Sequence, residues 1–114
     1  MLGKVIRNMY THIHIQSRDH WFKIVAMLQH NWALVDALPG DAGVIVYFVH
    51  DRSGVFDRLH FHDNRSAEYG LRRNGFARFR DDEESQEFLE PPTPPFWEDE
   101  HPNGPIYSSG RFWR

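Results

Sequence analysis

The chain has 114 residues, contains no cysteine and carries a net charge of −3. A single domain with one core is expected at this length, and the lack of cysteine excludes disulfide and thiolate chemistry. The charge is uneven, because residues 81–114 hold nine of the 16 acidic side chains but only two of the 13 basic ones. This weakens the case for nucleic acid binding by the whole chain but leaves room for a local basic face.

The N-terminal segment gives no sign of export. The sequence MLGKVIRNMYTHIHIQ has neither a sustained apolar run nor a small-residue cleavage site. No stretch of the chain approaches the roughly 20 apolar residues of a membrane-spanning helix. We therefore expect a soluble, cytoplasmic protein without a membrane partner.

The first elements are predicted to be a strand and a long helix. Residues 10–16, YTHIHIQ, alternate between two side-chain types, which is typical of a half-buried strand. Ser17 is the expected N-cap of the helix. Residues 17–38 then place apolar side chains at helical spacing, namely Trp21, Val25, Leu28, Trp32, Val35 and Leu38. Pro39-Gly40 ends this helix, because the residue before a proline avoids the helical region.

A β-hairpin is predicted next. Residues 44–50, VIVYFVH, form an apolar run that suits a buried strand, and residues 55–63 form the returning strand. Between them, residues 51–54, DRSG, are typical of a tight turn.

A second helix and a fourth strand complete the predicted domain. Ser66 is its expected N-cap, with Glu68 in the first turn, and Asn74-Gly75 is its expected end. Residues 76–80 alternate again and are predicted to form a strand. The order β-α-β-β-α-β predicts a ferredoxin-like α+β sandwich over residues 1–90.

The C-terminal part is predicted to be a short acidic helix at 81–90 and a stiff extension at 91–114. Six of the seven prolines lie between Pro91 and Pro105. The extension is rich in aromatic residues, unlike a disordered tail, so its rings are expected to be buried on the domain or on a partner. On this basis the chain is predicted to be a small non-catalytic interaction module, acting as an adaptor, an inhibitor or a homo-oligomer. The candidate interaction residues are Phe96, Trp97, Tyr107, Phe112 and Trp113.

Two His-x-His pairs form a candidate metal site. In the ferredoxin-like order the first and third strands are neighbours, and their polar residues share the face that the helices leave uncovered. Imidazoles on neighbouring strands could then bind zinc or another divalent metal. The candidate ligands are His12, His14, His60 and His62, and the alternative is that these rings are simply hydrated or hydrogen-bonded. The remaining histidines are expected to be ordinary surface or turn residues, namely His20, His30, His50 and His101.

Both tripeptides resemble a family motif. His12-Ile13-His14 and His60-Phe61-His62 are similar to the His-hydrophobic-His metal motif of HUH endonucleases. The resemblance implies a DNA-nicking enzyme with a tyrosine nucleophile on a following helix, and Tyr69-Gly70-Leu71-Arg72 is close to that family's Tyr-x-x-Lys pattern. However, Ala67 and Leu71 mark the core side of this helix. Tyr69 is therefore expected to face away from a metal on the front of the sheet.

Single-stranded nucleic acid is a further candidate ligand for the uncovered sheet face. That face would combine the histidines with aromatic and basic side chains, namely Tyr10, Arg58, Arg78 and Arg80. Residues 75–79, GFARF, resemble the glycine-aromatic signature of RNA-recognition motifs, although that family carries it on the third strand.

No motif in the sequence assigns a catalytic site. A glycine-rich phosphate loop after a strand and a Gly-x-Ser-x-Gly elbow are both missing. No catalytic residue is predicted, and no cofactor other than the candidate divalent metal.

Overall fold

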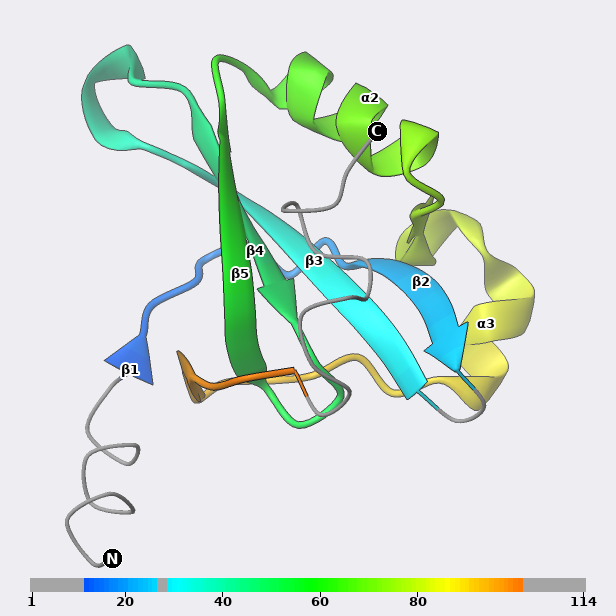
Figure 1. Cartoon of the computed structure of the whole chain (residues 1–114). Helices are drawn as coiled ribbons and strands as arrows, with labels where there is room; N and C mark the ends of the chain where they lie inside the picture. The colour runs from blue at the N-terminus through cyan, green and yellow to red at the C-terminus, as the bar shows by residue number, and fades with distance from the viewer. Residues whose placement is uncertain (1–11, 27–28, 102–114) are drawn as a thin grey trace, which may run out of the picture.

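The computed structural model describes residues 12–26 and 29–101. These residues form a seven-stranded mixed sheet in the order β1-β7-β5-β4-β3-β2-β6 (Figure 1). All neighbouring strands are antiparallel except β5 and β7, which are parallel. The strands are β1 (His12–Ile13), β2 (Trp21–Ala26), β3 (Gln29–Ala37), β4 (Val44–Val49), β5 (Gly54–Phe61), β6 (Ala77–Arg78) and β7 (Phe96–Glu98). The helical elements are α2 (Asn64–Arg73), α3 (Glu83–Phe88) and the short 3-10 turns η1 (Pro39–Asp41) and η2 (Phe79–Asp81).

The ferredoxin-like prediction is wrong. That fold has a four-stranded antiparallel sheet, whereas the described residues form seven strands, one pair of which is parallel. The expected neighbours are also separated, because β7 lies between β1 and β5. Within the described part of the chain β1 pairs with Phe96 and Trp97 of β7.

The error lies in residues 17–38, which form the antiparallel strands β2 and β3 in place of a helix. The central strand β3 is buried on both faces, so that four consecutive residues from Asn31 to Leu34 are buried. A strand covered on both faces loses the alternation of polar and apolar residues that identifies a strand in a sequence. Trp21 and Trp32 seemed to share a helical stripe, but they lie in two different core clusters on the sheet.

The predicted hairpin at 44–63 is confirmed by β4 and β5. The backbone N–H of His50 donates to the carbonyl of Gly54 at 2.9 Å, and the turn between them places Ser53 at a φ of 68°. The register pairs Val46 with Leu59 and Tyr47 with Arg58.

Both faces of the sheet are covered by other segments. On one face the buried residues Ala67 and Leu71 of α2 pack against Val44, Val46 and Phe48. Leu59 and Phe61 of β5 pack against the same cluster. On the other face a second cluster is built around Trp32, and the segments that cover it contribute Ile15, Phe79, Leu89 and Phe96.

The helix α2 was predicted almost to its ends. Its N-cap is Asp63 rather than Ser66, because the Asp63 carboxylate accepts the backbone N–H of Ser66 at 2.8 Å. This hydrogen bond lowers the pKa of the Asp63 carboxyl. At the other end Gly75 has a φ of 91°, the left-handed conformation that a glycine after a helix adopts at little cost.

The segment after α2 only partly follows the prediction. The strand expected at 76–80 is limited to Ala77 and Arg78, and the chain then turns into η2. The short acidic helix is confirmed as α3. From α3 the chain runs back across the sheet to β7, in yellow to orange in Figure 1. Phe96 is buried by this crossing, whereas residues 102–114 of the predicted extension lie outside the described residues.

Candidate functional site

Three segments far apart in the sequence meet at one end of the sheet. They are the start of β3, the β4–β5 turn and the residues that follow β7. Together they enclose a cleft of about 630 Å³ that we call the histidine cleft. Its lining residues are Gln29, His30, His50, Asp51, Arg52, Asp99, Glu100 and His101.

The first Asp–His pair of the cleft joins His30 and Asp51. Nδ1 of His30 lies 3.1 Å from Oδ1 of Asp51. The same carboxylate accepts the backbone N–H of His30 at 2.9 Å and the indole N–H of Trp32 at 2.8 Å. Because a carboxylate accepts and does not donate, Nδ1 of His30 carries the proton. Nε2 then has a lone pair, and it makes no hydrogen bond within the described parts of the chain.

The second pair joins His50 and Asp99 and is structural. The backbone N–H of Arg52 donates to Nδ1 of His50 at 3.0 Å, and Nε2–H of the same ring donates to Asp99 at 2.9 Å. Both ring nitrogens are therefore occupied. The His50 side chain is only 7% exposed and fastens the β4–β5 turn to the segment after β7. Gly54 makes room for this ring, since a Cβ there would lie 2.0 Å from Nε2 of His50.

His101 lines the cleft and is held in place by Asn31. Nε2 of His101 lies 2.6 Å from Oδ1 of Asn31, and both residues are buried. The His101 ring also packs edge-on against Phe56 at a centroid distance of 4.7 Å. Burial, followed by the electrostatic influence of the neighbouring His50 ring, lowers the pKa of His101, while Asp51 opposes this shift.

His20, a buried histidine outside the cleft, also has a lowered pKa. Burial lowers the pKa of His20, although its ring nitrogens lie 2.9 Å from the Pro92 carbonyl and 3.1 Å from the Arg18 carbonyl. A neutral imidazole has one N–H and can donate to only one of these oxygens at a time. His20 thereby links the start of β2 to the segment that precedes β7.

Stability should decline on mild acidification, because His20 and His101 resist protonation only in the folded state. In the unfolded chain both histidines become protonated near pH 6.5. Their contribution to the free energy of unfolding is therefore fully present above that pH and is lost as the pH falls below it. Urea unfolding at pH 7.5 and 5.5 measures the loss, and the double variant His20→Gln/His101→Gln should show a smaller one. Equal unfolding free energies of the parent protein at the two pH values would contradict this expectation.

The sequence interpretation of these histidines was wrong. His20, His50 and His101 are buried rather than surface residues, and His30, His50 and His101 gather in one cleft. A local signal existed in the adjacent His50-Asp51 and in the run Asp99-Glu100-His101. The sequence alone does not show that these stretches meet.

The predicted metal ligands are not brought together by the sheet. All four side chains are exposed, and β7 lies between the strand of His12 and that of His60. Nε2 of His60 lies 2.6 Å from the Ala42 carbonyl, and His62 contacts Asp63 at 3.2 Å. Among residues 12–26 and 29–101 no group of three potential ligand side chains has the arrangement needed to hold a metal ion.

Tyr69 lies on the outer side of α2, as the sequence predicted. Tyr69 is 64% exposed on α2, whose buried Ala67 and Leu71 face the sheet. The ring therefore lies on the side of α2 that is turned away from the sheet.

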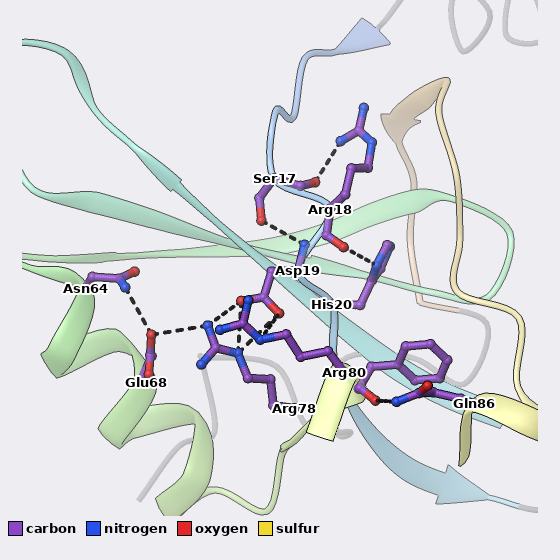
Figure 2. A network of polar contacts seen from close by, with 10 residues as sticks. Ser17, Arg18, Asp19, His20, Asn64, Glu68, Arg78, Arg80 and Gln86 are labelled. Atoms are coloured by element: carbon purple, nitrogen blue, oxygen red, sulfur yellow. Dashed lines mark hydrogen bonds and ion pairs between the residues drawn. The ribbon is translucent and has the colours of Figure 1, made fainter. Parts of the chain in front are cut away.

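The predicted nucleic-acid contacts are engaged with carboxylates. Arg58 forms an ion pair with Glu98. Figure 2 shows Arg78 and Arg80 both directed at Asp19, with Glu68 of α2 on the other side of Arg78. Hydrogen bonding to Asp19 raises the pKa of Arg78. Tyr10 lies outside the described residues.

The predicted interaction residues that the structure describes do not share one environment. Phe96 is 2% exposed and belongs to the core, and Trp97 is half-buried in β7. Tyr107, Phe112 and Trp113 lie outside the described residues.

Comparison with known proteins identifies no relative: no protein-family model, no curated protein and no solved structure matches the chain. Within the described ranges no helix is both long and apolar enough to cross a membrane.

Proposed function

We propose that the protein is a small hydrolase that activates water at the His30–Asp51 pair and acts on a neutral or cationic acyl substrate. The observation that carries this proposal is the hydrogen bonding of Asp51. Three donors fix the carboxylate, and one of them is Nδ1 of His30. The lone pair of Nε2 is left for chemistry in a cleft large enough for a small substrate.

Water is the nucleophile that fits the cleft. The chain has no cysteine, and the nearby Ser53 hydroxyl is buried and donates to the Thr93 carbonyl at 2.6 Å. His30 Nε2 would take a proton from water while the oxygen attacks the acyl carbon. The imidazolium would then return that proton to the leaving alcohol or amine. Asp51 would stabilise the imidazolium, and Arg52 is the cation available to the developing oxyanion.

The charge of the cleft supports an acyl substrate over a phosphate ester. Three carboxyl side chains line the cleft, those of Asp51, Asp99 and Glu100, against the single guanidinium of Arg52. This surplus of acidic groups repels anions and favours a neutral or positively charged substrate.

The proposal is tested with chromogenic substrates and the His30→Gln variant. The panel contains p-nitrophenyl acetate, an amine-bearing p-nitrophenyl ester and p-nitrophenyl phosphate. We expect the amine-bearing ester to be hydrolysed best, and His30→Gln to lower kcat/KM by about 10²- to 10⁴-fold, the usual contribution of a general base. His62→Gln is the matched control, because His62 is exposed outside the cleft and is expected to leave the rate unchanged. Equal rates for the His30 and His62 variants would refute the proposal.

An interaction module remains the second candidate. Its specific support is two large apolar side chains at the surface, Ile24 at 65% and Phe88 at 77% exposure. In the described part of the chain the ladder between β6 and β2 covers Trp21 and Phe22, so Ile24 lies beyond it. An exposed strand edge with apolar side chains is a common docking surface for a further strand. This candidate ranks second because nothing in the described residues indicates what would cover the edge.

A further inference from the structure

The outer surface of α2 carries a line of three long side chains at intervals of four residues. Arg65, Tyr69 and Arg73 lie one helical turn apart, so they share one side of the helix with about 6 Å of axial rise between neighbours. All three are exposed, and Tyr69 reaches 64%. We call this line the α2 stripe.

A second cleft of about 490 Å³ lies along the stripe. Phe61 of β5 supplies an apolar wall, and Gly70 contributes no side chain that would fill the space beside Tyr69. The cleft is lined by Phe61, Arg65, Ser66, Tyr69, Gly70, Arg73 and Asn74. It therefore offers a flat aromatic surface between two guanidinium groups.

The two arginines of the stripe have no carboxylate in ion-pair contact among residues 12–26 and 29–101, although Arg65 interacts electrostatically with Asp63 at the N-cap of α2. Within the described residues neither Arg65 nor Arg73 forms an ion pair, and Arg73 makes only a 3.5 Å contact with the Tyr69 hydroxyl. The acidic Glu68 on the same helix is engaged by Asn64 at 3.0 Å and by Arg78 at 3.8 Å. This contrasts with Arg58 and Arg78, whose charges are matched by carboxylates.

We propose that the α2 stripe binds single-stranded nucleic acid, with phosphates at Arg65 and Arg73 and a base stacked on Tyr69. Unpaired guanidinium groups attract phosphates, and an exposed aromatic ring between them provides the stacking surface that such sites use. An acidic peptide would satisfy the arginines but would leave the ring and its cleft unused. The stripe is a local basic surface, so the net negative charge of the chain does not oppose it.

This site is independent of the histidine cleft. The β4–β5 turn begins β5, whereas α2 follows the other end of that strand. The β5 strand has eight residues, which places its two ends roughly 25 Å apart. Failure of the hydrolase proposal would therefore leave the α2 stripe untouched.

Fluorescence anisotropy with a labelled 12-nucleotide strand, either oligo-dT or oligo-U, tests the proposal on the full chain. We expect binding at 50 mM NaCl, and a slope of log K against log[salt] that becomes shallower by about 0.7 for each arginine removed. Tyr69→Ala should weaken binding by roughly 5- to 100-fold, whereas Tyr69→Phe should retain it. Arg52→Ala removes the same charge at the distant turn and should have no effect on binding.

Three outcomes would overturn the proposal. The first is the absence of binding by the parent protein at low salt. The second is a loss of affinity in Arg52→Ala that equals the loss in Arg65→Ala or Arg73→Ala, which would show a non-specific charge effect. The third is competition by a polyglutamate peptide combined with unchanged affinity of Tyr69→Ala, which would assign the surface to acidic peptides.

Discussion

The variant Asp51→Asn should lose about 10²- to 10⁴-fold in kcat/KM for the acyl ester while it keeps its fold. An asparagine retains an oxygen for the indole N–H of Trp32, which donates to Asp51 at 2.8 Å. It carries no charge and therefore cannot stabilise an imidazolium as Asp51 does.

The kinetic effect of Asp51→Asn can be separated from a loss of stability. Thermal unfolding should show a modest decrease in Tm, since the indole N–H of Trp32 and the backbone N–H of His30 bond to different oxygens of Asp51 and an asparagine keeps only one of them. Asp41→Asn makes the same chemical change on η1, outside the cleft, and should leave both the rate and the stability unchanged. Wild-type activity in Asp51→Asn would refute the role assigned to the His30–Asp51 pair.

The variant Gly54→Ala should destabilise the fold by about 1–3 kcal/mol, because the added methyl group enters occupied space. Its Cβ would lie 2.0 Å from Nε2 of His50 and 2.7 Å from Cβ of Asp99. Gly54 is not among the residues with positive φ, so the cost is steric rather than conformational. The His50 ring cannot simply rotate away, since it is buried and hydrogen-bonded at both nitrogens. Urea unfolding measures the effect.

A double-mutant cycle with His50→Ala identifies the obstacle. Removal of the imidazole takes away the two nearest obstacles to the new methyl group and leaves only Cβ of Asp99, so Gly54→Ala should cost at least about 1 kcal/mol less in that background. The same cost in both backgrounds would show that His50 does not set the requirement for glycine at position 54.

Local sequence signals were enough to predict the elements that lie next to a characteristic turn or helix end. The Asp51–Gly54 turn predicted the β4–β5 hairpin, and Asn74-Gly75 predicted the end of α2, because the left-handed φ of Gly75 is a local property of the backbone. The hairpin of β2 and β3 was missed because Asn31–Leu34 are buried on both sides. Only the long-range packing against α2 on one face and Phe96 on the other explains that pattern.

The candidate site could not be predicted for a related reason. His30, His50 and His101 come from three segments that meet only through the pairing of β3 with β4 and the return of the chain to β7. The alternation of His12, His14, His60 and His62 is visible in the sequence, but β7 separates their strands. The arginine and tyrosine spacing on α2 was visible as well. Its significance depends on which arginines find carboxylate partners, and only the fold decides that.

The most direct test of the account is the protonation of the His30 ring in the wild-type protein, measured by long-range ¹H–¹⁵N correlation at pH 8. We predict that Nδ1 carries the proton and Nε2 does not, because Nδ1 donates to Asp51. For His50 we predict the reverse, since its Nδ1 accepts the N–H of Arg52. A His30 ring protonated on Nε2, or one that exchanges between both forms as in a free peptide, would contradict the account.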